Sequence, residues 1–569
     1  MRNRCRRSAR RPGPNRVRCA PRLARFRCRR AGWWPQSRQA MWNCARFTPM
    51  DDSGLRVFQL RLDGIAQMMQ ETLFRCAVSP VVREGNDASA ALFATDGEVL
   101  ALSDAIPLLL GALQGTVAAI TSIYPVAQMQ PGDLFVMNDP YSGGTHLPDL
   151  TVVMPVFHEG TAIALAATIL HHQDVGGSRA GSVPPDATEI YQEGLRLPPM
   201  RLGQGGQIDD GMRRLIAANS RAPDTVLGDI GAQIAAANRA ATALGALAGE
   251  TGAQAFIARG LACRDMAERQ IGRVLSALPP GPFDGLDGLD PHPDLGQIDI
   301  RVRLSLKGGK FDVDFTGTSP QVKAPINCVR SGPLAAAFYS LLSLAGSDVA
   351  RNGGVLRVLR LTLPEACVIN ASPPAAVNAR MGVVRVTTSA VLRAVAQAAP
   401  SRMPAANSGM SYVLAFSGKG ADGAPFLVTE IIAGGAGGGP DRHGTPGIST
   451  DVGNAMNMPG EGLEAMAPVR LLRAEVRRGS GGDGLFKGGD GITREYLALA
   501  DDIAVSLRGD RFLRVPEGLN SGGAPRPARA QVIAADGTMR ELASRSAVVL
   551  MQGDRLLVES SGGAGYGAA

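Results

Sequence analysis

The sequence has few cysteines and no long apolar run. Beyond residue 50 it contains four widely spaced cysteines without a C-x-x-C pair: Cys76, Cys263, Cys328 and Cys367. This spacing argues against a disulfide framework and indicates buried thiols in a reducing compartment. No apolar stretch reaches the roughly 18 residues that a membrane-spanning helix needs. We therefore expect a cytoplasmic protein without a membrane segment.

Lysine and acidic residues are absent from residues 1–49, which carry fifteen arginines and all three tryptophans. Without these fifteen, 44 basic residues remain against 51 acidic ones, so the rest of the chain is net negative. The positive sign of the whole-chain charge of +8 comes from this segment and does not indicate nucleic acid as a partner of the rest. The segment also lacks the apolar core of a secretory signal. We predict that residues 1–49 are disordered and are a mis-called extension before a true start at Met50. A nucleic-acid-binding arm is the alternative.

The glycine-rich stretches lack the residues of a phosphate-binding loop. Residues 434–439 lead into Pro440-Asp441-Arg442, where a P-loop has lysine followed by serine or threonine. Such glycines are typical of places where backbone closely approaches backbone or a ligand. We expect no ATP site on this chain.

Hydrophobic periodicity predicts an α+β fold, a large mixed α/β body with a helical insert and a β-rich, Gly-rich C-terminal region. Helices are expected at residues 55–77, 110–123, 334–345 and 389–398, with several more in the Ala-rich stretch 209–278. Strands are expected at 132–137, 150–157, 161–172, 298–306 and 309–315, and a hairpin at 88–102 around Asp96-Gly97. Asp186 and Glu189 have the spacing of a capping box that would open a further helix.

Residues 279–295 are rich in proline and glycine and are predicted to form a linker or surface loop. We accordingly divide the body into residues 50–285, an α/β region with the helical segment and the candidate site, and 286–569, a mixed, β-rich C-terminal region.

Three of only six histidines lie in two short segments that also carry aspartates. His146 and Asp149 form an H-x-x-D triplet in the first, and His171-His172-Gln173-Asp174 forms the second. Neutral imidazole with carboxylate is the ligand set of Zn, Mn or Fe(II), and the mixture suits an open, catalytic centre. Loop histidines with local hydrogen bonds are the alternative.

Strand geometry bears on the choice between the paired histidines. Successive side chains of a strand point to opposite faces, so His171 and His172 cannot both face one ion. We expect His172, on the face of Asp174, to be the ligand beside His146 and Asp149. His171 and Asp174 are then the expected catalytic residues, with Asp174 orienting a histidine ligand from behind.

Several long blocks, in order along residues 50–569, resemble the hydantoinase B/oxoprolinase family, which includes N-methylhydantoinase B, the C-terminal half of 5-oxoprolinase and the alpha subunit of acetone carboxylase. The blocks are GDLFVMNDPYSGGTHLPDLTVVMPVF (132–157), HHQDVGG (171–177), GSVPPDATEIYQEGLRLPP (181–199), PPAAVNARMGVVR (373–385), NAMNMPGEGLEAMAPVRL (454–471), GSGGDGLFKGGDGITREY (479–496) and RGDRFLRVPEGLNSGG (508–523).

The resemblance implies a hydrolase of cyclic amides that works with a hydantoinase-A-like, ATPase-fold partner subunit. The partner would bind ATP, and this chain would carry one divalent metal (Mn, Zn or Fe). Carried over by motif, the metal ligands are His146, Asp149 and either His172 or His171. No nucleic acid or membrane partner is implied.

Two alternatives follow from the same resemblance. One is the alpha subunit of an acetone-type carboxylase, and the other is a non-catalytic scaffold that completes the partner's active site. The sequence also departs from the family: members usually carry a histidine in the segment matching residues 106–111, where this chain has Leu109. That departure bears on the class of substrate.

Overall fold

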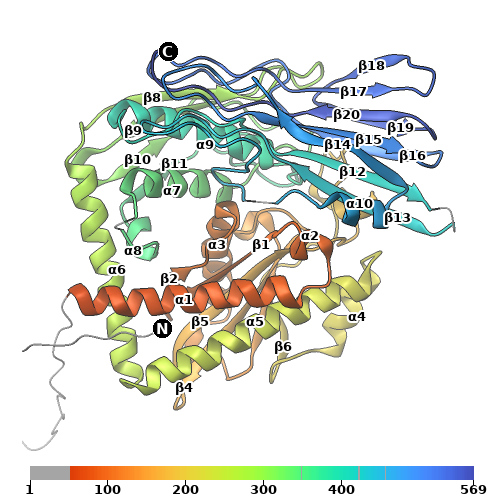
Figure 1. Cartoon of the computed structure of the whole chain (residues 1–569). Coiled ribbons are helices and arrows are strands. Elements are labelled where there is room, and N and C mark those ends of the chain that lie inside the picture. The colour runs from red at the N-terminus through yellow and green to blue at the C-terminus, as the bar shows by residue number, and fades with distance from the viewer. Residues whose placement is uncertain (1–51, 348, 421–422, 455) are drawn as a thin grey trace, which may run out of the picture. The chain divides into compact units, whose positions relative to one another are not determined.

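Figure 1 shows a computed structural model that describes residues 52–347, 349–420, 423–454 and 456–569. The predictions for residues 1–49 and for the start at Met50 lie outside these ranges. No helix of the described ranges is long and apolar enough to cross a membrane. The four cysteines within them are free thiols; Cys76 is exposed, against the expectation of burial, and the other three are buried.

A seven-stranded antiparallel sheet forms the first layer, in the order β2-β1-β5-β4-β3-β6-β7. Its strands are β1 (Ala88–Phe93), β2 (Val99–Leu102), β3 (Leu134–Met137), β4 (Asp149–His158), β5 (Thr161–His171), β6 (Met200–Gln204) and β7 (Gln207–Ile208). The Asp96-Gly97 turn joins β1 to β2, which confirms the predicted hairpin.

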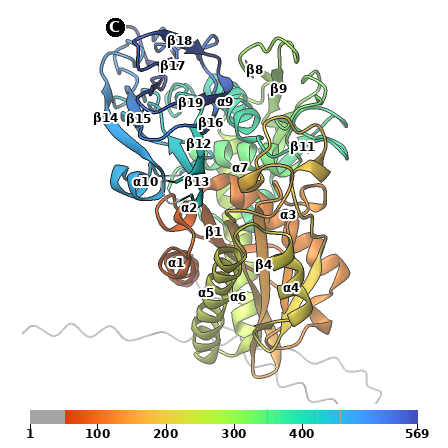
Figure 2. The ribbon, with the colours of Figure 1, turned by 90° about the vertical axis from the view of Figure 1, so that its right-hand side faces the viewer.

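Helices cover both faces of this sheet. The helices α1 (Asp52–Cys76) and α5 (Pro223–Gly249) pack on one face, and α3 (Pro107–Ile123) packs on the other (Figure 2). Within β1, Leu92 points into the cluster under α1 and α5, whereas Phe93 points toward α3. Because both faces are buried, the sequence of β5 is a continuous apolar run and does not alternate.

The helical insert is confirmed, since the helices α4 (Asp210–Ala218), α5 and α6 (Ala253–Ser276) fill the Ala-rich stretch. Behind α3 lie α7 (Ser331–Ala345) and α9 (Met381–Ala398), which contact one another, and α9 contacts a second sheet. That sheet has the order β11-β10-β9-β8, with β8 (Phe283–Gly288), β9 (Asp299–Ser305), β10 (Phe311–Asp314) and β11 (Leu359–Thr362). Short helices complete these parts: α2 (Pro80–Arg83), α8 (Gly353–Leu356) and the 3-10 turns Val126–Gln128, Pro140–Ser142, Ala180–Ser182, Ile190–Gln192 and Lys307–Gly309.

Two further sheets share one apolar core in the C-terminal region. The first, β13-β12-β16-β19, contains β12 (Tyr412–Lys419), β13 (Pro425–Ile432), β16 (Ile503–Arg508) and β19 (Arg545–Leu550). The second, β14-β15-β20-β17-β18, contains β14 (Val469–Arg477), β15 (Gly491–Ala498), β17 (Arg529–Ile533), β18 (Met539–Leu542) and β20 (Arg555–Glu559). The helix α10 (Gly460–Met466) lies against β13 and β14.

The glycine-rich stretches form a bundle of extended backbone segments, here called the glycine bundle, comprising residues 434–439, 480–491 and 561–567. The segments bond to each other directly: Gly489 N donates to Ala436 O at 2.8 Å and Gly563 N donates to Gly489 O at 2.9 Å. A Cβ built on Gly435 would lie 1.9 Å from Gly489 O. These glycines therefore allow backbone to pack on backbone, one of the two roles expected for them.

Three predictions about elements need correction. Residues 279–295 are not a loop throughout, because β8 runs through them and buried Asp287 pairs with Arg511 at 2.8 Å. The helix predicted from Ser389 begins at Met381. The capping box is formed by Glu189 and Gln192, and it opens only a 3-10 turn.

The boundary near residue 285 falls inside β8, and the described residues form one compact unit. One apolar cluster includes Phe135 from one side of that boundary and Val391 from the other. The two-region division stays a prediction about organisation.

Candidate metal centre

The pairing of β4 with β5 brings Asp149 opposite His171. Residues directly opposite each other in an antiparallel pair project from the same face, so the two side chains meet. His146 joins them from the turn before β4, which is closed by a hydrogen bond from Asp149 N to His146 O of 3.1 Å. One potential ligand atom from each of the three residues lies within 4.8 Å of the other two. The His146 and His171 ring centroids are 5.0 Å apart.

The tautomer of His146 follows from its partner on a distant loop. Its Nδ1 lies 3.1 Å from the carbonyl oxygen of Asn378, which can only accept, so Nδ1 carries the hydrogen and Nε2 carries the lone pair. Burial, together with the charge of Arg380, lowers the pKa of His146 to about 3 against the opposing effect of Asp149. The ring is therefore neutral at pH 7, the form in which imidazole binds a metal.

Asp149 is held through one of its two oxygens. Its Oδ2 accepts hydrogen bonds from Thr145 Oγ1 and from Arg380, the latter at 2.6 Å. Burial opposes ionisation of this carboxyl, yet its pKa lies below the ordinary value because the Arg380 guanidinium favours the carboxylate. Oδ1 is left 3.0 Å from His146 Nε2.

Asn378 and Arg380 were not among the predicted site residues. Both come from the segment just before α9, more than 200 residues along the chain from His146. Their only signal in the sequence is the block 373–385, which contributes to the family resemblance without marking any single residue.

The structure places the paired histidines differently from the prediction. His172 points away from His146, is fully buried, and lies with Nε2 3.3 Å from Gln233 Oε1 of α5. Burial lowers the pKa of His172 to about 4. The two side chains do point in opposite directions, as strand alternation predicts. However, β5 ends at His171, so strand geometry does not place His172 and Asp174 on a common face.

Asp174 forms a hydrogen bond with neither histidine and instead organises the loop after β5. Its carboxylate accepts hydrogen bonds from the backbone N–H groups of Gly176, Gly181 and Arg221, and it pairs with the Arg221 guanidinium at 3.1 Å. The expectation that Asp174 orients a histidine ligand is therefore wrong, because each hydrogen bond of its carboxylate is to this loop or to Arg221.

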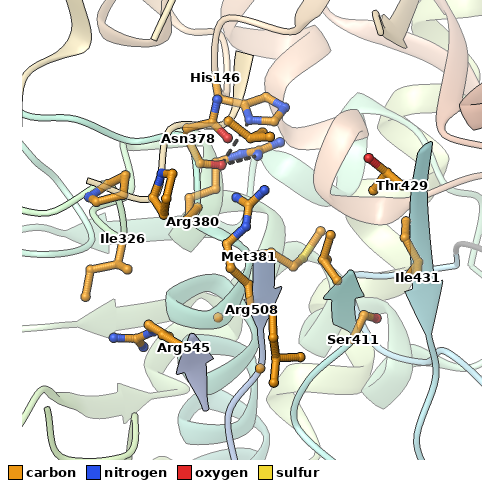
Figure 3. Close-up of a pocket in the computed structure, with 18 of the residues that line it drawn as sticks. His146, Ile326, Asn378, Arg380, Met381, Ser411, Thr429, Ile431, Arg508 and Arg545 are labelled. Atoms are coloured by element: carbon orange, nitrogen blue, oxygen red, sulfur yellow. Dashed lines mark hydrogen bonds between the residues drawn. The ribbon is translucent and has the colours of Figure 1, made fainter. Parts of the chain in front are cut away.

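The candidate centre opens on a cavity of about 470 Å³. His146 and His171 line one wall, the first turn of α9 another, and strands of the β13-β12-β16-β19 sheet a third. Figure 3 shows His146, Asn378 and Arg380 grouped above Arg508 and Arg545. Leu109 also lines this cavity.

The three potential ligand atoms fit a divalent metal. Among the described residues, His146 Nε2, Asp149 Oδ1 and His171 Nδ1 are buried without a hydrogen-bond partner. A buried lone pair facing a buried carboxylate oxygen is costly unless a cation lies with them. Two imidazoles and one carboxylate are a donor set that Zn, Mn and Fe(II) accept.

Fold and site together define an α+β protein with a cluster of buried His146, buried Asp149 and partly buried His171 beside a large cavity. The hydantoinase B/oxoprolinase family matches residues 51–569, so the chain belongs to this family.

Two curated relatives illustrate its range. The chain is 31% identical to 5-oxoprolinase 1 of Arabidopsis thaliana over 90% of its own length and 42% of that protein. It is 30% identical to a protein of Pseudomonas sp. (strain NS671) that is named as a putative D-/L-hydantoinase subunit, over 81% of this chain and 80% of that one. The chain thus spans about two fifths of the 5-oxoprolinase.

Two solved structures share the fold. The crystal structure of the ATP-dependent caprolactamase from Pseudomonas jessenii matches with a TM-score of 0.83 and 26% identity, covering 91% of each chain. Nucleotide-free acetone carboxylase matches with a TM-score of 0.81 and 17% identity, covering 91% of this chain and 76% of that one, a likeness of fold alone.

Proposed function

We propose that this chain is the subunit of an ATP-dependent cyclic-amide hydrolase that carries a divalent metal at His146, Asp149 and His171. Membership in the hydantoinase B/oxoprolinase family supports a hydrolase of cyclic amides in general terms. The likeness to an ATP-dependent caprolactamase over 91% of the chain supports the ATP-dependent type. One relative is named as a subunit of a hydantoinase, which supports a partner for this chain, and we propose that the partner is an ATPase-fold chain that binds the nucleotide.

One observation carries the metal site: His146 Nε2 and Asp149 Oδ1 lie 3.0 Å apart without a hydrogen bond between them. Since Nδ1 of His146 carries the ring hydrogen, both facing atoms are acceptors. A proton could bridge them only on an imidazolium, and the low pKa of His146 opposes that form. A bound cation removes the conflict.

When bound, such a metal would polarise an amide carbonyl or lower the pKa of a water molecule toward about 7. The chain's own residues supply the rest of the arrangement. Arg380 and Thr145 fix Asp149, the Asn378 carbonyl fixes the His146 ring, and Leu109 forms part of the apolar wall of the cavity beside them.

The two alternatives have less support. The acetone-type carboxylase alpha subunit rests on a likeness at 17% identity, which carries the fold only. A non-catalytic scaffold would not need His146 Nε2 and Asp149 Oδ1 to be buried and unpaired. It would also not need Arg380 and Thr145 to fix the other oxygen of Asp149.

The test is turnover by the chain co-purified with its partner subunit. We expect hydrolysis of at least one cyclic amide among hydantoin, 5-oxoproline and caprolactam, dependent on ATP and lost on chelation of the metal. The chain alone should show no ATP binding in a calorimetric titration. Carboxylation of acetone without amide hydrolysis would favour the carboxylase, and an active complex with His146→Ala would favour the scaffold.

A further inference from the structure

Arg508, the last residue of β16, is an unpaired cation in the wall of the cavity. Its guanidinium makes no hydrogen bond and has no carboxylate within 4.0 Å in the described part of the chain. Three other arginines of the wall differ: Arg380 bonds to Asp149 at 2.6 Å, Arg385 to Ser411 at 2.7 Å and Arg545 to Asp510 at 3.3 Å. Among these four arginines, only Arg508 has all of its guanidinium N–H donors available to a ligand in the cavity.

The charge on Arg508 persists at neutral pH. Burial lowers its pKa to about 10 and Arg380 acts in the same direction, while Glu193 opposes them. A guanidinium that is half-buried and unpaired costs free energy, and an anion placed beside it offsets that cost. The position is therefore suited to a negatively charged ligand group.

Two features beside Arg508 also present positive charge to the cavity. Residues Arg380 to Val383 line the cavity, so the first turn of α9 faces it, and the N–H groups of a first turn have no acceptor within their own helix. The Nε of buried Arg380 also lacks a hydrogen-bond partner. Figure 3 shows the Arg508 side chain pointing toward Arg380 and His146.

The carboxylates of the same wall do not cancel this charge. Asp510 is paired with Arg545, and Asp149 is occupied by Arg380 and Thr145. Asp87 and Asp294 also line the cavity, and neither forms an ion pair with Arg508.

We propose that Arg508 binds an oxyanion of the ligand, with Arg380 and the first turn of α9 as neighbours, and so selects ligands that carry one. A planar guanidinium matches a carboxylate or a phosphoryl group through two parallel N–H donors. The oxyanion is either a carboxylate on the cyclic amide or the phosphoryl group of an activated amide. That the rest of the ligand is a cyclic amide rests on the proposed function, whereas the anion site itself does not.

The experiment measures binding to the full chain, without ATP or partner, by calorimetry. Three probes are used: 5-oxoproline, its uncharged analogue 2-pyrrolidinone, and inorganic phosphate. Arg508→Gln removes the charge, Arg508→Lys keeps it without the planar fork, and Lys323→Gln removes an exposed charge that lines the same cavity. Thermal unfolding and bound metal are recorded for each variant.

We expect the wild-type chain to bind 5-oxoproline or phosphate, and Arg508→Gln to weaken that binding by roughly 10- to 100-fold while leaving 2-pyrrolidinone unaffected. Arg508→Lys should recover part of the loss, and Lys323→Gln should bind as wild type. Tighter binding of 5-oxoproline identifies the substrate carboxylate, and tighter binding of phosphate identifies the phosphoryl group.

Equal anion affinity in the wild type and Arg508→Gln overturns the proposal, as does the absence of anion binding by the wild type. An equal loss of anion affinity in Lys323→Gln also overturns the proposal, since the general positive potential of the cavity would then account for the weaker binding. A chain that binds the anion through Arg508 but hydrolyses no amide with its partner would refute the proposed function and leave this inference standing.

Discussion

At the scale of single residues, the two neighbouring histidines at the end of β5 have opposite surroundings. His171 faces His146, Asp149 and the cavity, whereas His172 lies against Gln233 under α5. One belongs to the candidate metal centre and the other to the core, so replacing each should change a different property.

We predict that His171→Ala removes bound metal, because it deletes one of three ligands, and lowers the free energy of unfolding only to that of the metal-free wild type. His172→Ala should keep the metal but lower the free energy of unfolding by about 2–4 kcal/mol, since it opens a cavity and leaves Gln233 Oε1 unpaired. Metal analysis and denaturant unfolding of the two purified variants measure both properties. Loss of metal in His172→Ala with normal stability would contradict the assignment.

Glu193 predicts a pH dependence of stability. It is fully buried and accepts hydrogen bonds from Val377 N and Asn378 N, and burial raises its pKa from 4.5 to about 7. Between these values the folded chain holds a proton that the unfolded chain has lost, so the free energy of unfolding falls as pH rises, by up to about 3 kcal/mol from this group.

The isosteric, uncharged variant Glu193→Gln should flatten that part of the stability profile. Urea unfolding of both proteins at a series of pH values from about 4.5 to 7.5 gives the comparison. Parallel profiles for wild type and Glu193→Gln would show that Glu193 does not titrate in this range.

At the scale of elements, the glycine bundle depends on side chains being absent. Gly435 illustrates this, because a Cβ there would lie 1.9 Å from Gly489 O and 2.6 Å from Gly563 N, both rigid backbone atoms. Gly462 in α10 is the matched control, since its nearest neighbour would be Met458 Cγ at 4.0 Å.

We predict that Gly435→Ala destabilises the chain by about 3 kcal/mol or more through overpacking. Gly462→Ala should be neutral or stabilising by up to about 1 kcal/mol, because alanine is the better helix former. Differential scanning calorimetry of the two variants decides the point. Similar melting temperatures would mean that the bundle relaxes around an added methyl group.

The sequence predicts much of the element order but less of where elements end. The apolar runs around residues 150–157 and 161–172 identify β4 and β5, and so place Asp149 near the paired histidines. Which histidine faces Asp149 depends on the register of β4 against β5 and on β5 ending at His171, and hydrophobic periodicity does not determine a strand's last residue. In residues 279–295, proline and glycine conceal β8, whose buried Asp287 is neutralised by Arg511 from the C-terminal region.

At the scale of the whole described chain, the candidate site combines distant segments. The β4–β5 pair and the turn before β4 supply the three potential ligands, the segment before α9 supplies Asn378 and Arg380, and β16 supplies Arg508. Sequence patterns are local, so they locate the histidines and aspartate but give no measure of these long-range contacts. The family resemblance marks the same blocks and implies His146, Asp149 and one of the paired histidines as ligands, but it assigns no role to Asn378, Arg380 or Arg508.

The central claim is that His146, Asp149 and His171 hold one divalent metal, and anomalous X-ray diffraction tests it most directly. Crystals of the chain grown with Mn or Zn should show one strong anomalous peak within about 2.0–2.2 Å of His146 Nε2, Asp149 Oδ1 and a His171 ring nitrogen. A peak bound through His172, or full metal loading with no peak at these three residues, would contradict the account.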